Sequence, residues 1–393
     1  MNLAADRLKL AQLQLENQQW QKAIASLRQV LESNPQDDSL QFQLGKHLRN
    51  LGLIEEAIIC FYCTLRLNPH HSQVYTSLSY IDLPSQWRDR LIELYREILA
   101  RHPNISEALA NLAQLLSEND DLSEAIAFSR RAIYTKTIQE NPQLSKINWA
   151  ATKQQPPDFI IIGVGKAGTT SLYKYLSHHP QILLPNKKEL RFFDRNFNRG
   201  SQWYLAQFPT ISDYPDFLTG EASPSYFFLP HVAQRIKDFA PKTRLIVMLR
   251  HPVTRTISNY YQNKKTGAQT KTLAESIQQE IKALNQKSEQ QLSYGGGLIS
   301  QSLYYYKLKR WLKIFPREQF LILNSESFFA HPAKSMQKVA QFLDLPVVNH
   351  HKYLQYNTGS YPEANECIKQ QLANFFLIHN QRLEELLEIK FNW

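Results

Sequence analysis

Residues 159–172 read "FIIIGVGKAGTTSL", an unbroken apolar run that leads into a turn with three glycines. The run predicts a buried strand ending at Gly163, and apolar Leu172 and Leu176 predict a helix that begins near Thr169. Glycines let backbone N–H groups wrap an anion, and the N-terminus of a helix adds partial positive charge. This strand, turn and helix therefore favour a phosphate site.

Four further apolar runs follow, with helical stretches between them. They read "QILLP", "FLTGEAS", "RLIVMLR" and "FLILNSESF". Short apolar runs separated by helices are typical of strands that are buried on both faces of a mainly parallel sheet. We therefore expect residues 158–393 to form one α/β domain of the P-loop-like type.

A 34-residue period marks the first third of the chain. Prolines follow it at positions 35, 69 and 103. Small residues recur with the same step where two helices would cross: Ala11, Gly45, Ser79 and Ala113. This period resembles the tetratricopeptide repeat (TPR), a helix pair that stacks on its neighbours to form a grooved solenoid. The resemblance implies an all-α TPR solenoid over residues 1–135 that binds a protein or peptide, and the fading period leaves 136–157 as a linker.

The bulk composition fits a protein of two folded domains. A net charge of +10 over 393 residues favours anionic partners without selecting one, and we expect no nucleic acid. Three cysteines, Cys60, Cys63 and Cys367, make no disulfide framework, which favours a reducing, cytoplasmic location. No apolar stretch approaches the ~18 residues of a membrane span, so neither a transmembrane segment nor an export signal is expected.

The glycine turn nearly matches the nucleoside-triphosphate pattern G-x-x-x-x-G-K-[ST], because Gly163 and Gly168 have the required separation. Thr169 stands where that pattern has its lysine. The lysine of the turn, Lys166, lies on its crest instead, from where it cannot approach a β/γ-phosphate pair in the usual way. A kinase or hydrolase of ATP or GTP is therefore a minor alternative.

Two segments resemble the phosphate motifs of sulfotransferases that use 3′-phosphoadenosine 5′-phosphosulfate (PAPS). The turn resembles their 5′-phosphosulfate loop, which implies donor contacts from Gly165, Lys166, Ala167, Gly168, Thr169 and Thr170. The segment "RLIVMLRHPVTRTISNYY" resembles their 3′-phosphate element, which implies that Arg250 and Ser258 hold that phosphate. A guanidinium fork and a hydroxyl suit this task because both donate to phosphate oxygens.

The segment "LLPNKKELRFFDRNF" resembles the heparan sulfate and glycosaminoglycan branch of that family, where the glutamate of a Lys-Glu pair before two phenylalanines is catalytic. Glu189 is the matching position. The chain departs from that branch at Ala222, where the animal enzymes have a lysine, and at Cys367, which has no second cysteine near it. Their basic loop is replaced by "NTGSYP", residues 357–362, from which we expect nucleotide contacts of Gly359, Ser360 and Tyr361.

The resemblance implies in-line sulfuryl transfer without a metal. Glu189 would act as the general base on the acceptor, and Lys166 would neutralise the leaving bisphosphate. The expected acceptor is a hydroxyl, or an amine, of a carbohydrate or other cell product, which Lys264, Lys265 and Lys271 could hold if it is acidic. Two alternatives stay open: a TPR interaction protein whose second domain binds a nucleotide without catalysis, and a protein tyrosine sulfotransferase.

Overall fold

The computed structural model describes residues 10, 11, 14, 19–146, 149, 154–211, 216–348, 352–356, 359 and 361–393. It divides the chain into two compact units, Met1–Ile147 and Asn148–Trp393. Among the described residues, every helix is too short or too polar to span a lipid bilayer.

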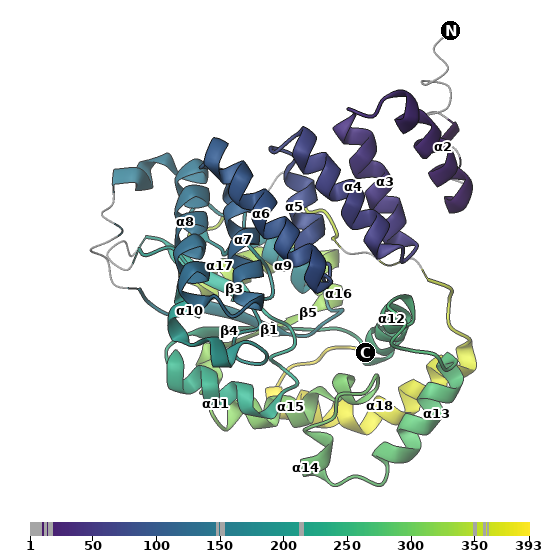
Figure 1. The fold of residues 1–393 in the computed structure, drawn as a ribbon. Helices are drawn as coiled ribbons and strands as arrows, with labels where there is room; N and C mark the ends of the chain where they lie inside the picture. Colours follow the sequence, from purple (N-terminus) through teal and green to yellow (C-terminus); the bar gives the residue numbers. More distant parts are fainter. Residues whose placement is uncertain are drawn as a thin grey trace. The chain divides into compact units, whose positions relative to one another are not determined.

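The first unit consists of helices that form the purple to blue part of Figure 1. Their bounds are α2 Trp20–Ser33, α3 Asp38–Asn50, α4 Ile54–Leu67, α5 Ser72–Ser79, α6 Ser85–Arg101, α7 Ser106–Glu118, α8 Leu122–Glu140 and the 3₁₀ helix Pro142–Lys146. Helices α3 and α4 pack as one hairpin and α7 and α8 as another. The first helix of the predicted repeats falls largely outside the described residues.

The small residues of the 34-residue period lie where the helices of a hairpin approach closely. Gly45 of α3 faces α4, and a Cβ atom added to it would come within 2.7 Å of the Phe61 ring. A side chain at this position would therefore push the two helices apart. Two ion pairs, Arg28–Glu56 and Arg96–Glu124, also follow this period. Arg96 lies two repeats after Arg28, and Glu124 lies two repeats after Glu56.

The prolines of the period set the lengths of the second helices. Pro35, Pro69 and Pro103 each follow a helix end by two residues, after α2, α4 and α6. The equivalent position in the last repeat is Thr137, which has a backbone N–H to donate, and α8 continues to Glu140. The segment 136–157 that the sequence predicts as a linker thus begins inside this helix, and its bounds stay a prediction.

The second unit is built on a parallel sheet of five strands, in the order β2-β3-β1-β4-β5. The strands are β1 Phe159–Gly163, β2 Ile182–Leu183, β3 Leu218–Ala222, β4 Arg244–Leu249 and β5 Phe320–Asn324. They coincide with the five apolar runs of the sequence, so the predicted α/β sheet is confirmed. Strand β1 pairs with β3 and β4, in the register Phe159–Gly220 and Phe159–Arg244.

Helices and short 3₁₀ turns connect and flank the strands of this sheet (Figure 1). The helices are α9 Thr169–Leu176, α10 Ser201–Leu205, α11 Pro230–Phe239, α12 Pro252–Lys265, α13 Leu273–Leu284, α14 Glu289–Leu292, α15 Tyr304–Leu312, α16 Ser325–Ala330, α17 Pro332–Phe342 and α18 Glu366–Leu387. After β1 the chain runs to β2 at one edge of the sheet, and after β4 it runs to β5 at the opposite edge. The carboxyl ends of β1 and β4 thus flank the switch point where open α/β sheets bind their ligands.

Candidate active site

The first predicted anion site is the glycine turn between β1 and α9. Strand β1 ends at Gly163 and α9 begins at Thr169, as the sequence predicts. Gly168 has a φ of 95° and sits under the Phe329 ring, where an added Cβ atom would lie 2.7 Å from the ring. Lys166 has a φ of 74°, a left-handed conformation that costs a non-glycine residue about 1–2 kcal/mol. Surrounding contacts must therefore hold this turn in shape.

Three neighbours of the turn supply those contacts through its carbonyl oxygens. Nε of Arg255 donates to the Gly165 oxygen at 3.2 Å, and Nη1 of Arg250 donates to the Lys166 oxygen at 3.0 Å. The hydroxyl of Ser325 donates to the oxygen of Ala167 at 2.9 Å. Because each peptide is planar, fixing its carbonyl group also fixes the direction of the N–H group behind it. The turn is thus held in shape by contacts within the protein itself.

The second predicted anion site lies at the end of β4 and on the helix that follows. Arg250 comes directly after β4, and its Nε donates to the hydroxyl of Thr254 at 3.1 Å. Ser258 lies two turns along α12 and is buried. Arg250 also contacts the glycine turn through the Lys166 carbonyl, so the two predicted phosphate sites are joined by one side chain.

One cavity of about 900 Å³ brings the predicted residues together. This volume lies within the span of ligand-binding clefts. Ten of the predicted residues line it: Gly165, Lys166, Gly168, Thr169, Thr170, Glu189, Arg250, Ser258, Gly359 and Tyr361. The side chain of Ala167 is fully buried beneath the turn, and Ser360 lies outside the described residues. The ring of Tyr361 stacks on Tyr261 with 4.8 Å between centroids.

Glu189 follows β2 and lines the same cavity. Its backbone N–H donates to the carbonyl of Ala222 at 3.0 Å, directly at the end of β3. Its φ is 67°, again a left-handed conformation. Its side chain is 46% exposed and is ion-paired to Lys188, whose Nζ lies 2.7 Å from Oε1. The carboxylate is therefore accessible to a ligand, with a cation beside it.

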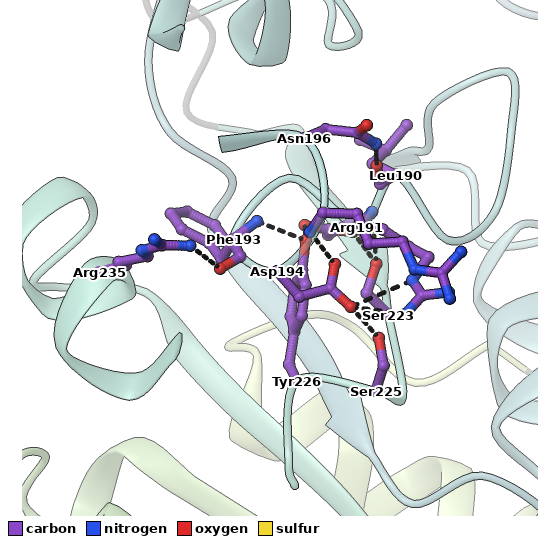
Figure 2. Close-up of polar contacts among 11 residues, drawn as sticks. Leu190, Arg191, Phe193, Asp194, Asn196, Ser223, Ser225, Tyr226 and Arg235 are labelled. Atoms are coloured by element: carbon purple, nitrogen blue, oxygen red, sulfur yellow. Dashed lines mark hydrogen bonds and ion pairs between the residues drawn. The ribbon is translucent and has the colours of Figure 1, made fainter. Parts of the chain in front are cut away.

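The segment after Glu189 is clamped to the end of β3 by a polar network (Figure 2). The Arg191 N–H donates to the Ser223 hydroxyl at 3.1 Å, and the Phe193 N–H donates to the Tyr226 hydroxyl at 3.3 Å. The carboxylate of Asp194 accepts from the guanidinium of Arg191 at 2.8 Å and from the Ser225 hydroxyl. Figure 2 also shows Arg235 donating to the Phe193 carbonyl, and Asn196 to the Leu190 carbonyl. Residues 189–196 thus have a fixed path past the cavity.

A buried acid, Glu221, lies beneath this clamp. Its carboxylate accepts from the hydroxyls of Tyr204 and Ser223 at 2.7 Å and of Tyr226 at 3.1 Å. Burial raises the pKa of Glu221 to about 7, although the three hydroxyl donors oppose the shift. Since Ser223 and Tyr226 also hold Arg191 and Phe193, Glu221 orients the hydroxyls that clamp the segment.

The cavity is lined by cations that repel one another. Burial lowers the pKa of the Lys166 ammonium, and the charges of Arg250, Arg255 and Lys265 lower it further. Nζ of Lys166 lies 3.3 Å from the amide oxygen of Gln262 on α12. Gathering positive charge in a partly desolvated cleft favours the entry of an anion.

Several residues that line the cavity were not predicted from the sequence: Lys188, Ser225, Arg255, Gln262, Gln301 and Ser325. Helical periodicity could have found two of them, because Arg255 and Gln262 lie three residues before and four residues after Ser258 on one face of α12. Gln301 and Ser325 reach the cavity from distant parts of the chain, and no local pattern marks them.

A model of the sulfotransferase domain matches residues 156–376, more than half of the chain. Two tetratricopeptide repeat models match residues 8–70 and 94–127. These matches agree with the two units of the structure.

Individual relatives carry the same description. The chain is 30% identical over 295 residues to heparan sulfate glucosamine 3-O-sulfotransferase 5 of Mus musculus, covering 67% of this chain and 82% of that protein. It is 26% identical over 312 residues to the membrane-associated sulfotransferase kil1 of Dictyostelium discoideum, covering 60% and 66%. The crystal structure of a sulfotransferase from Alicyclobacillus acidocaldarius aligns with a TM-score of 0.49 and 30% identity over 60% of this chain and 97% of that one.

The family resemblance that the sequence motifs indicate is therefore confirmed, and the helical unit that precedes the sheet is a tetratricopeptide region. The chain belongs to the sulfotransferase family.

Proposed function

We propose that the protein transfers the sulfuryl group of PAPS to a hydroxyl of a carbohydrate. One observation carries the proposal: a single cavity is lined by the glycine turn with Lys166, by Arg250 with Ser258, and by the carboxylate of Glu189. Two separate anion sites fit the two phosphate-bearing ends of an adenosine 3′,5′-bisphosphate unit. A carboxylate in the same cavity fits an acceptor whose proton must be removed.

The turn fits the 5′ end of such a donor. Its carbonyl groups already have donors from Arg250, Arg255 and Ser325, and the first N–H groups of α9 have no acceptor within the helix. Lys166, which shares the cavity with these N–H groups, would neutralise charge that develops on the leaving phosphate. Arg250 and Ser258 would hold the 3′-phosphate, with the guanidinium already oriented by Thr254.

In the proposed reaction Glu189 takes the proton of the acceptor hydroxyl as the acceptor oxygen bonds to sulfur. The bond between sulfur and the bridging phosphate oxygen breaks, and its electron pair leaves with adenosine 3′,5′-bisphosphate. The ion pair with Lys188 supports this role, because it positions the carboxylate at the wall of the cavity.

The acceptor class is proposed from the Mus musculus relative, whose name specifies a glucosamine unit of heparan sulfate. Ala222 is fully buried, so its side chain adds no polar contact to an acceptor. Of the three lysines that an acidic acceptor could use, Lys265 lies close enough to the cavity to lower the pKa of Lys166. Reversing the charge of Lys264, Lys265 and Lys271 together should weaken the binding of an acidic acceptor. Unchanged binding would remove these lysines from the proposal.

We further propose that the tetratricopeptide region recruits a protein partner or substrate, and that the enzyme acts in the cytoplasm, as its sparse cysteines suggest. The groove of such a solenoid suits an extended peptide. A peptide substrate would also make tyrosine sulfation possible, so the acceptor has to be identified directly.

The test is to incubate the full chain with ³⁵S-labelled PAPS and cell extract, and to digest the labelled material separately with glycan lyases and with protease. Label in a glycan would support the proposal, and label on tyrosine would replace the acceptor. Binding of ATP in preference to PAPS, or PAPS binding without transfer to any acceptor, would overturn it.

A further inference from the structure

The arginine at position 255 has an unusual environment for a basic residue. Its side chain is 1% exposed, yet it lines the cavity. Its guanidinium donates to neutral acceptors: the carbonyl oxygens of Gly165 at 3.2 Å and Leu298 at 3.1 Å, the amide oxygen of Gln301 and the hydroxyl of Ser302. These acceptors give each nitrogen of the guanidinium a hydrogen bond but do not compensate its charge.

Within the described part of the chain, Arg255 makes no ion pair with a carboxylate. The acid whose charge does act on it, Glu280, accepts instead from the backbone N–H groups of Ile299 and Ser300 at 3.1 and 2.9 Å. Burial accordingly lowers the pKa of Arg255 to about 10. A buried charge without a partner is costly, so its presence needs an explanation.

The position of Arg255 indicates where the missing negative charge belongs. Its Nε is bonded to the glycine turn, which is the proposed site of the 5′-phosphate. It also precedes Ser258 by one turn on the same face of α12, and Ser258 belongs to the proposed 3′-phosphate site. Arg255 thus lies beside both anion sites, where it adds positive charge to each.

We infer that Arg255 is a positioning residue for the sulfuryl donor, whose phosphates supply the counter-charge that no carboxylate brings into contact with this guanidinium. The inference rests on the proposed donor and goes beyond it, because it assigns binding to a side chain to which the resemblance of neither phosphate motif gives a role. Arg255 acts in two ways: it fixes the carbonyl of Gly165, and it provides a desolvated charge beneath the cavity.

The two contributions can be separated by substitution. Arg255→Lys keeps the charge but cannot donate to four acceptors at once, whereas Arg255→Gln keeps a donor and loses the charge. Arg317 gives a matched control, because its guanidinium also donates to a backbone carbonyl, that of Phe320 at 2.8 Å, and it does not line the cavity.

The experiment is calorimetric titration of the full chain with adenosine 3′,5′-bisphosphate at 50 and 300 mM NaCl. We expect Arg255→Gln to raise Kd by about 10- to 100-fold at low salt, the range of a hydrogen bond to a charged group. Arg255→Lys should lose less than Arg255→Gln, and Arg317→Gln should bind like the parent. The Kd of the parent should rise more steeply with salt than that of Arg255→Gln, because it has one more cation beside the ligand.

Parent-like binding by Arg255→Gln would overturn the inference and leave the proposed donor intact. So would equal weakening by both substitutions at both salt concentrations, which would assign Arg255 to the shape of the turn alone. Absence of binding by the parent would instead overturn the proposed donor, and the inference with it. If Arg255→Gln does not fold, Arg255→Lys provides the test. A Kd that rises less than about 10-fold, with the salt dependence of the parent, supports a role for the charge of Arg255 in binding. A larger rise in Kd with the same salt dependence contradicts that role.

Discussion

The ammonium group of Lys188 lies 2.7 Å from Oε1 of Glu189, so the carboxylate proposed as the base is ion-paired to the residue before it. The Lys188 side chain is 12% exposed, whereas that of Glu189 is 46% exposed. Both side chains line the cavity, and the carboxylate is the more exposed of the two. An acceptor hydroxyl that enters the cavity can therefore reach the carboxylate, with a cation beside it.

Glu189→Gln tests the assignment of the base. The amide keeps the size of the side chain but cannot take a proton, so we expect transfer to fall by about 10²- to 10⁴-fold, the usual effect of losing a general base. Binding of adenosine 3′,5′-bisphosphate should stay within about 3-fold of the parent, a change of less than 1 kcal/mol. Transfer is measured as label moved from PAPS to the acceptor, with exposed Glu385→Gln on α18 as the control. A parent rate in Glu189→Gln would assign the base elsewhere.

Lys166→Met tests the glycine turn as a phosphate site. Removing an ammonium group that bonds a phosphate should raise the Kd for adenosine 3′,5′-bisphosphate by about 10- to 100-fold. The measurement is calorimetric titration, and Lys174→Met, an exposed position on α9 outside the cavity, serves as the control. If both variants bind alike, the turn does not contact the nucleotide through its lysine.

Glu221→Gln tests the buried acid beneath the clamp. The folded protein holds the proton of Glu221 up to about pH 7, whereas the unfolded chain releases it near the ordinary value of 4.5. The folded state therefore binds more protons between these pKa values, and the stability that Glu221 contributes is lost as pH rises through that window. Between pH 5 and 7 the free energy of unfolding should fall by about 2 kcal/mol more in the parent than in the variant, because the slope approaches but does not reach about 1.36 kcal/mol per pH unit over the whole window. Parallel curves from urea unfolding would contradict this.

Lys307→Met tests a second buried ionisable group, whose effect on stability is expected above pH 7. Nζ of Lys307 is buried and donates to the carbonyl oxygens of Leu292 and Ser300 at 2.8 and 2.6 Å. Burial lowers the pKa of Lys307 to about 7, and the nearby charges of Arg310 and Arg255 lower it further. Here the unfolded chain binds the extra proton, so the stability of the parent should rise relative to the variant as pH increases from 7 to 9, by about 2 kcal/mol.

The two buried groups serve as controls for each other, because each variant should alter the pH dependence on one side of neutrality only. The informative quantity is the slope, since either substitution also leaves neighbouring hydrogen-bonding groups without a partner and shifts the whole curve. An altered slope on the wrong side of pH 7 in either variant would refute the assignment of its titration.

The sequence predicts the second unit well because its signals are local. Each strand is a short apolar run, and the start of α9 at Thr169 follows from the glycine turn before it. The repeat period likewise places the ends of α2, α4 and α6. It does not place the end of α8, because the proline that stops the other helices is replaced by Thr137.

The candidate site is predictable only where a motif spans it. Lys166, Arg250 and Ser258 belong to such motifs, and the structure brings them to one cavity. Ser325 and Gln301 act through contacts with the turn and with Arg255, and these contacts form only when β5 and the segment before α15 have packed. Long-range packing of this kind leaves no trace in the spacing of residues, whereas Arg255 could have been found from the helical period of α12.

The anchoring of the Gly165, Lys166 and Ala167 carbonyls has a kinetic consequence. A cradle that is already in its final shape loses little conformational entropy when a nucleotide enters, and it gains as little when the nucleotide departs. Both phosphates, the one that this turn would hold and the one that Arg250 and Ser258 would hold, stay on the spent nucleotide after the sulfuryl group has gone. Release of that nucleotide, and not the transfer of the sulfuryl group, would then be the rate-limiting step of each catalytic cycle.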